Sequence, residues 1–382
     1  MFNIINRIYA IAIAVVVSSA VAIAANPAAN SAEIKIGLVG SLTGAQATFG
    51  QSTHKGVELA VKEINAAGGI KGKKIKLISL DDQGRPEEAA TVVTRLISQE
   101  KVTVVLGEVA SSVSLAMAPI AQQNKIPMIT PSSTNPKVTE IGDYIFRVCF
   151  IDPFQGKVMA KFAIENLKIK KVAVLTDVKN DYSVGLTQFF KDTFKKMGGE
   201  IVVEQSYSNG DMDFKSQLTA IKSKNPEAIY VPGYYGDVGL IARQAASLKL
   251  KVPLLGGDGW DSPKLQEIGG KAISGSYFSN HYSSEDKSPH IQEFIVRYQK
   301  EYGVVPDGLA ALGYDAALVF AEAVKRAKSW DTADIRKEIA QTKSFKGVTG
   351  VITMDEKRNP VKSAVVLAVT ESGFKYQTTV NP

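Results

Sequence analysis

From Glu33 onward the chain alternates between two hydrophobic periodicities. Runs such as EIKIGLVG are short, apolar and rich in β-branched residues, which is typical of a buried strand. The following segment STHKGVELAVKEINAAGG repeats apolar residues near helical spacing and stops at paired glycines. Because apolar strands alternate with helices of this length, the pattern predicts βαβ units and a parallel sheet with helices on both faces.

This cycle runs through two similar halves of the chain. In the first half the predicted strands are EIKIGLVG, KIKLISLDD, VTVVLGE and IPMITP, with helices that begin near Pro86 and Ser111. After YIFRVCFIDP the second half places strands KVAVL, EIVVEQ, EAIYVPG and VPLLGG after or between predicted helices at 154–166, 184–197, 214–223 and 238–248. The sequence therefore predicts an α/β fold made of two Rossmann-like lobes.

The last hundred residues break this symmetry. Two long helical patterns, near 289–301 and 308–327, precede the β-like runs GVITM and SAVVLAV. Neither feature fits a third domain, so we expect the chain to return to the first lobe and cross again. The predicted lobes are 33–150 with 281–362, and 151–280 with 363–382. Several connections between two lobes predict a multi-strand hinge beside a cleft.

The N-terminus has the features of a secretory signal peptide over residues 1–24. Arg7 is the only charge before Glu33, and it precedes an apolar run and the small-residue stretch AVAIAA. A permanent anchor is the alternative, but Ser18, Ser19 and the following ANPAANSAE make a poor spanning helix. With no cysteine near the cleavage region, we expect an exported protein without a lipid anchor.

Composition excludes several classes of protein. The 382 residues are 45% apolar and 22% charged, which is enough apolar content for two cores and argues against disorder. The net charge of +7 comes from interspersed lysines, and the densest basic run, KGKKIK, has no aromatic residues among its lysines. We therefore expect no nucleic-acid partner.

Hydroxyl side chains follow two predicted strands of the first lobe. GEVASS brings Ser111, and ITPSSTNP brings Ser132, Ser133 and Thr134. Ligands of open α/β sheets bind beyond the carboxyl ends of the strands, and backbone N–H groups at a helix start receive anions. Helix capping is the alternative for any single one of these residues. Two such loops together favour a binding site.

Three loops of the second lobe carry aromatic and acidic residues after strands. TDVKNDYSVG contains Tyr182, VPGYYGD contains Tyr234, and LGGDGWDSP contains Asp258 and Trp260. The aromatic rings supply apolar wall with a polar tip, and Asp258 is suited to pair with a cation. Capping is again the alternative for Asp258, but Asp261 is better placed to cap a helix after Pro263.

Residue sets for catalysis are sparse. The three histidines are scattered, and with the single Cys149 they form no metal-ligand cluster. The chain has no P-loop, no G-x-S-x-G elbow and no dinucleotide fingerprint. We expect a binding protein without cofactor or metal; a hydrolase that uses Ser111 is the alternative, and the loops offer it no general base.

The succession of these motifs resembles a known family. The run from IKIGLVGSLTGAQATFG to TVVTRLI, followed by VLGEVASS, MITPSSTNP and NDYSVGL, is similar to the periplasmic leucine/isoleucine/valine-binding proteins. These are the type I solute-binding components of branched-chain amino-acid ABC transporters, and the similarity covers essentially the whole mature chain. The resemblance implies that Ser111, Ser132 and Thr134 hold the carboxylate and ammonium of a ligand.

The resemblance also implies the other side of the site. Tyr182, Tyr234 and Asp258 match the residues that close on the ligand from the second lobe, and Phe49 matches an aromatic residue of the side-chain pocket. Some relatives carry glutamate where Asp258 stands, and a disulfide of some relatives is impossible with one cysteine.

The expected function is a flytrap arrangement that closes on a zwitterionic α-amino acid, branched-chain or otherwise apolar. The ligand carboxylate would meet Ser111 and the backbone of Ser133 and Thr134, and Val109 and Trp260 would complete the side-chain pocket. The expected location is a Gram-negative periplasm, with the protein a monomer whose partners are the permease subunits of an ABC transporter. Two alternatives are a carboxylate or amide solute without an ammonium, and a periplasmic sensory module.

Overall fold

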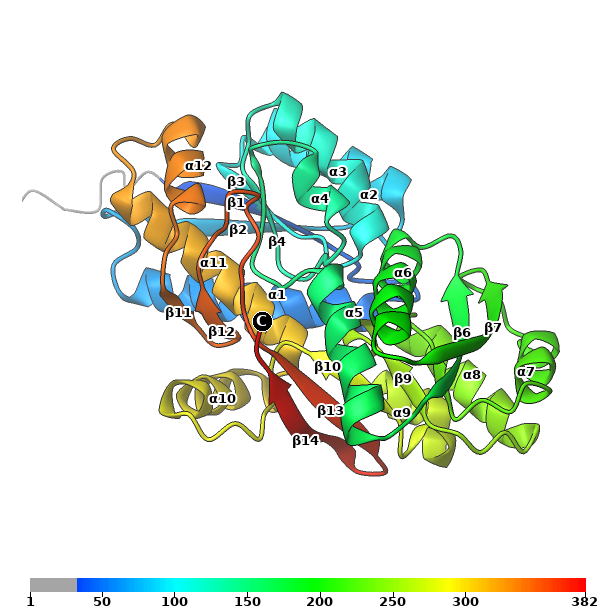
Figure 1. Cartoon of the computed structure of the whole chain (residues 1–382). Coiled ribbons are helices and arrows are strands. Elements are labelled where there is room, and N and C mark those ends of the chain that lie inside the picture. Colours follow the sequence, from blue (N-terminus) through cyan, green and yellow to red (C-terminus); the bar gives the residue numbers. More distant parts are fainter. Residues whose placement is uncertain (1–32) are drawn as a thin grey trace, which may run out of the picture. The chain divides into compact units, whose positions relative to one another are not determined.

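A five-stranded parallel sheet organises the first lobe. The structure is a computed structural model that describes residues 33–382, so the predicted signal peptide lies outside the described residues. The strand order is β2-β1-β3-β4-β5, and every neighbouring pair is parallel. Strands β1 to β4 are labelled in Figure 1. The strands are β1 Ile34–Gly40, β2 Ile75–Asp81, β3 Val104–Leu106, β4 Met128–Thr130 and β5 Ile145–Arg147.

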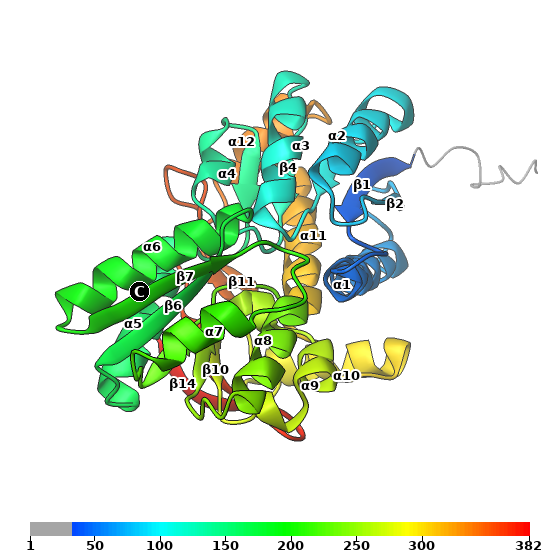
Figure 2. The ribbon, with the colours of Figure 1, turned by 90° about the vertical axis from the view of Figure 1, so that its right-hand side faces the viewer.

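The helices of the first lobe come from two parts of the chain. Four connect its strands: α1 Ala47–Ala66, α2 Pro86–Arg95, α3 Ser111–Gln123 and α4 Lys137–Glu140. Three more arrive after the second lobe: α10 Pro289–Tyr302, α11 Gly308–Arg326 and α12 Thr332–Ala340. Helices α1 and α11 lie side by side (Figure 2), although more than two hundred residues separate them along the chain. The late helices therefore complete the lobe that the early strands began.

A seven-stranded sheet with order β14-β13-β10-β9-β8-β6-β7 organises the second lobe. Its strands are β6 Lys171–Asp177, β7 Glu200–Tyr207, β8 Ala228–Tyr230, β9 Leu254–Gly256, β10 Tyr277–Asn280, β13 Ala364–Thr370 and β14 Gly373–Val380. Its helices are α5 Asp152–Lys161, α6 Asp181–Lys196, α7 Lys215–Lys222, α8 Tyr235–Ser247 and α9 Lys264–Gly269.

The C-terminal elements differ from the sequence prediction. Strand β13 is antiparallel to both β10 and β14, and a tight turn joins β13 to β14 in a hairpin. Helix α12 and strand β14 were not predicted from the sequence. The run GVITM supplies β12, Gly350–Ile352, which pairs only with β11, Phe345–Gly347, in a separate two-stranded sheet.

The chain passes between the two sheets at three places: after β5, after β10 and before β13. These crossings lie near Phe150, His281 and Lys362, and the Lys362 Nζ donates to the Val148 carbonyl oxygen at 3.3 Å. The predicted multi-strand hinge is therefore present, while the predicted residue boundaries of the lobes remain a prediction.

Candidate functional site

A small pocket lies where the strand ends of the two lobes meet. It spans about 240 Å³, part of which is open to solvent, and its wall comes from both lobes. The lining residues are Phe49, Val109, Ser111, Ser132, Tyr182, Tyr234, Asp258, Gly259 and Leu309. Seven of the ten residues predicted from the sequence are among them. A wider groove of about 1300 Å³ runs past Ser52 and Phe374, but it includes none of these seven.

The first-lobe side of the pocket is the start of α3. Strand β3 ends at Leu106, and the helix begins at Ser111, whose side chain is 1% exposed. The preceding residue, Ala110, makes no side-chain hydrogen bond to the first turn. The Glu108 carboxylate accepts the Ala110 N–H, but among the described residues no side chain accepts the N–H groups of Ser111, Ser112 and Val113. These N–H groups carry the positive end of the helix dipole. This end of the pocket is suited to a carboxylate.

Ser133 and Thr134 lie behind the pocket wall instead of lining it. The Ser133 hydroxyl oxygen lies 2.9 Å from the carbonyl oxygens of both Glu108 and Val109, either of which can accept its proton. The Ser133 N–H donates to the Thr130 hydroxyl. Thr134 is completely buried, and its carbonyl accepts the Asp152 N–H at 3.0 Å. Both residues shape the loop that presents Ser132, and their role as direct ligand contacts stays a prediction.

Asp258 forms the second-lobe side of the pocket and is 5% exposed. Three side chains contact its carboxylate. Gln155 Nε2 donates to Oδ1 at 2.6 Å, while His281 Nε2 lies 3.0 Å and Ser132 Oγ 3.2 Å from Oδ2. An ionised carboxylate has about four acceptor positions, so these contacts leave about one for a ligand.

Sequence reasoning missed Gln155, His281 and Leu309 as neighbours of the site. His281 was noted only as one of three scattered histidines, and Gln155 sits in the first turn and a half of α5. Gln155 lies inside a helix, and the strand β10 that precedes His281 was not predicted from the sequence, so neither residue was recognised as following a strand. Leu309 lies one residue inside α11 and reads as an ordinary core position.

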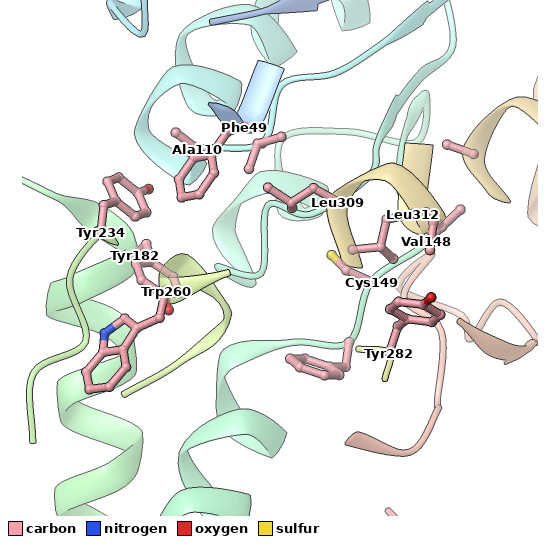
Figure 3. Packing of buried hydrophobic residues seen from close by; sticks show 14 of the residues in the cluster. Phe49, Ala110, Val148, Cys149, Tyr182, Tyr234, Trp260, Tyr282, Leu309 and Leu312 are labelled. Atoms are coloured by element: carbon pink, nitrogen blue, oxygen red, sulfur yellow. The ribbon is translucent and has the colours of Figure 1, made fainter. Parts of the chain in front are cut away.

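Three aromatic rings form the apolar wall (Figure 3). Phe49 contacts Tyr234 edge-on with centroids 5.4 Å apart, and Tyr234 stacks on Tyr182 at 5.5 Å. The Tyr182 hydroxyl accepts the Gly259 N–H at 3.2 Å. Burial raises the pKa of both tyrosines well above 10, so both phenols are neutral at physiological pH. The wall is therefore uncharged and suits an apolar side chain.

Trp260 lies outside the pocket lining. Its indole is completely buried in the second lobe, where Nε1 donates to the Val231 carbonyl at 3.1 Å. The ring packs near Phe278 with centroids 6.0 Å apart and points away from Phe49 (Figure 3). Its predicted contact with a ligand side chain stays a prediction, and in this structure Trp260 supports the Asp258 loop from behind.

The predicted capping role of Asp261 is wrong. Helix α9 begins at Lys264 after Pro263, and Asp261 Oδ2 instead accepts the Gly308 N–H at 2.7 Å. Gly308 opens α11 of the first lobe, so this carboxylate joins the two lobes. The Asp261 carboxylate therefore binds the first N–H of α11 in the other lobe and does not cap α9, the short helix that follows Asp261 in the sequence.

A second buried acid, Asp152, lies at the start of α5 near Asp258. Burial, together with the nearby charge of Asp258, raises its pKa to about 8. Cys149, at the first crossing, is also completely buried, and burial raises its pKa to about 12. A thiol with that pKa is protonated and unreactive at physiological pH. Within residues 33–382 no group of three or more His, Cys, Asp or Glu is arranged to hold a metal.

Comparison with known proteins identifies the family of this chain. The model of a family described as periplasmic binding protein matches residues 33–375. The chain belongs to this periplasmic binding protein family. A Leu/Ile/Val-binding protein homolog of Brucella melitensis is 34% identical over 327 residues, which cover 85% of this chain and 88% of the relative.

Two solved periplasmic binding proteins have nearly the same fold. The leucine-binding protein LivK of Thermotoga maritima has a TM-score of 0.88 and 43% identity, covering 91% of this chain and 99% of that chain. The substrate-binding protein LivJ of Streptococcus pneumoniae, solved with isoleucine, has a TM-score of 0.87 and 36% identity, covering 92% and 100%. The predicted type I fold and family are therefore confirmed.

Membership of the periplasmic binding protein family settles two further expectations. Its members are solute-binding components of transporters, so the chain is a binding protein and not an enzyme. The family also places the protein outside the cytoplasm. In the described part of the chain, no helix has both the length and the apolar character needed to cross a membrane.

Proposed function

We propose that the chain captures the zwitterion of an apolar α-amino acid between its lobes and delivers it to the permease of an ABC importer. One observation carries the proposal. The pocket has the uncapped positive end of α3 on one side and the Asp258 carboxylate on the other, with an uncharged aromatic wall between them. A ligand with one carboxylate, one ammonium and an apolar side chain satisfies all three surfaces.

The relatives support the same class of ligand. The Thermotoga maritima relative is a leucine-binding protein, and the Streptococcus pneumoniae relative was solved with isoleucine. The pocket is small and is lined by Phe49, Val109 and Leu309, which favours an aliphatic side chain. We further propose that the protein works as a monomer in a Gram-negative periplasm, after removal of a signal peptide over residues 1–24.

The test is calorimetric titration of the mature protein with leucine, isoleucine, valine and phenylalanine. Each amino acid is paired with its deaminated analogue, for example leucine with 4-methylpentanoate. We expect leucine to bind and its analogue to bind far more weakly, because Asp258 would then face no cation. Equal affinity for both members of each pair would contradict the zwitterion.

The variant Asp258→Asn tests the acid directly. We expect it to weaken leucine binding by about 2–5 kcal/mol, which is roughly thirtyfold or more, because the ammonium would lose a buried charged partner. Asp192→Asn is the matched control, since Asp192 is exposed on α6 of the same lobe. Unchanged leucine affinity in Asp258→Asn would remove the acid from the site.

A carboxylate or amide solute without an ammonium is the second candidate. The contacts to Asp258 support such a solute in one respect. About one acceptor position remains on the carboxylate, and an amide N–H fills one position as well as an ammonium does. Tight binding of a deaminated acid or an amide, with no binding of amino acids, would select this candidate.

A further inference from the structure

Both oxygens of the Asp258 carboxylate are held by side chains of the second lobe and its hinge. Gln155 on α5 donates to Oδ1 at 2.6 Å, and His281 lies 3.0 Å from Oδ2 at the end of β10. Both side chains are buried, with residue exposures of 0% and 4%. An aspartate side chain has one rotatable bond fewer than a glutamate side chain. Contacts at both carboxylate oxygens therefore fix the direction in which the Asp258 carboxylate points.

The third contact to this carboxylate has a different origin. Ser132 Oγ reaches Oδ2 from the loop after β4, which belongs to the sheet of the first lobe. In contrast, β9 and β10, which lead into Asp258 and His281, are paired neighbours in the sheet of the second lobe. Separating the lobes therefore breaks the Ser132 contact and leaves the His281 contact in place.

The surroundings of His281 fix its protonation. Burial lowers the pKa of His281, and the groups that face it are Asp258, Lys362 and the ring of Phe150. Phe150, from the first crossing, stacks on the imidazole with centroids 3.6 Å apart. Nδ1 has no hydrogen-bond partner among the described residues, so the proton belongs on Nε2, where it is donated to Asp258. A buried Nδ1 lone pair without a donor costs less free energy than a buried N–H group without an acceptor.

We propose that Gln155 and His281 are positioning residues that hold the Asp258 carboxylate toward the pocket before a ligand arrives, and that they thereby set the preference for an ammonium-bearing solute. This inference rests on the proposed function. Preorganising a charged group reduces the cost of ordering it when the ligand binds. Ser132 then adds its contact only when the lobes approach each other.

Two variants remove one donor each with little change in shape. His281→Phe keeps a flat ring against Phe150 but cannot donate to Asp258. Gln155→Leu removes the other donor, and the Gln155 Oε1 has no partner that would be lost. We expect each to weaken leucine binding roughly tenfold to hundredfold, the value of a hydrogen bond to a charged group.

The readout that separates positioning from general support of the fold is the ratio of affinities for leucine and 4-methylpentanoate. A positioning role predicts that this ratio falls in both variants, because only the amino acid uses Asp258. A purely structural role predicts that both ligands weaken equally, and that result would overturn the inference. His281→Gln, which restores an N–H donor, should recover part of the ratio, and His290→Phe at an exposed position serves as control.

A double variant distinguishes this inference from the proposed function. In the Asp258→Asn background, we expect His281→Phe to cost less than about threefold further, because the two changes remove one shared interaction. If Asp258→Asn weakens binding while His281→Phe and Gln155→Leu bind like the parent, only the positioning inference fails. If Asp258→Asn itself binds leucine normally, both proposals fail.

Discussion

Asp258 and Asp152 lie close together in the second lobe, but the groups around their carboxylates differ. Asp258 receives hydrogen bonds from Gln155, His281 and Ser132, which stabilise a negative charge. Asp152 is completely buried, and burial together with the charge of Asp258 raises its pKa to about 8. At the residue scale, hydrogen bonds therefore hold the carboxylate that faces the pocket, while its buried neighbour Asp152 is largely protonated near neutral pH.

This difference predicts a pH dependence of stability. From the ordinary aspartate pKa of about 4 to about 8, the folded state holds the Asp152 proton more tightly than the unfolded state. The free energy of unfolding should therefore fall as pH rises through this window. Asp152→Asn removes the titration, so relative to the parent it should gain roughly 1–4 kcal/mol between about pH 5 and about pH 8.

Urea denaturation at both pH values measures this gain. Asp192→Asn, at an exposed position, should follow the parent at both pH values. A parent and an Asp152→Asn variant with parallel pH profiles would show that Asp152 is already ionised in the folded protein.

At the scale of elements, the pocket wall depends on how closely α1 approaches α11. These helices carry Phe49 and Leu309 to the pocket. A Cβ on Gly56 of α1 would lie 1.9 Å from the Ala310 carbonyl oxygen, and one on Gly313 of α11 would lie 2.5 Å from the Thr53 carbonyl oxygen. Glycines on facing helices therefore allow a separation that any side chain would prevent.

Gly56→Ala should accordingly destabilise the fold by about 1–3 kcal/mol, as overpacking does in well-packed interiors, and should weaken leucine binding by displacing Phe49. Gly236→Ala in α8 is the matched control, because a Cβ there meets nothing within 4 Å. Alanine's better helix propensity should leave that control unchanged or up to about 1 kcal/mol more stable. Thermal unfolding measures both, and equal melting temperatures for the two variants would contradict the close approach.

At the scale of the whole described chain, side chains from one lobe contact the other around the pocket. The Thr48 and Ser262 hydroxyl oxygens are 3.0 Å apart, the Ser112 hydroxyl lies 3.0 Å from Asp181 Oδ2, and the Tyr235 hydroxyl donates to the Ala45 carbonyl at 2.8 Å. This arrangement is the closed form that a ligand contacting both lobes stabilises by its differential affinity. Opening must break these contacts and turn the chain at the three crossings.

A disulfide across the cleft tests that motion. In the variant Thr48→Cys with Ser262→Cys, oxidation should join the lobes, because the parent oxygens are already 3.0 Å apart. The native thiol of Cys149 does not compete, since burial raises its pKa to about 12. Leucine added after oxidation should bind at least about tenfold more slowly than to the reduced protein, as measured by stopped-flow tyrosine and tryptophan fluorescence.

Leucine present during oxidation should instead be retained, and dithiothreitol should restore normal exchange in both samples. Unaltered association in a protein shown by mass spectrometry to be fully crosslinked would mean that ligands enter without separation of the lobes.

The sequence by itself determined the α/β class, the two lobes and most helices and strands. Periodicity records which positions along one element are buried, and that information is local. It also placed Ser111, Ser132 and Asp258 beyond strand ends, where parallel sheets gather their loops, and the structure lines the pocket with all three.

Only the tertiary structure decided which residues meet across distant parts of the chain. His281 reaches Asp258 because β9 and β10 are neighbours in the sheet, and Gln155 does so because α5 packs against that sheet. Trp260 reads like a pocket residue in sequence, yet its indole enters the core, since a short loop allows a large amphipathic ring to face either side. Strand order and loop direction depend on packing between elements, and no pattern within a single element contains them.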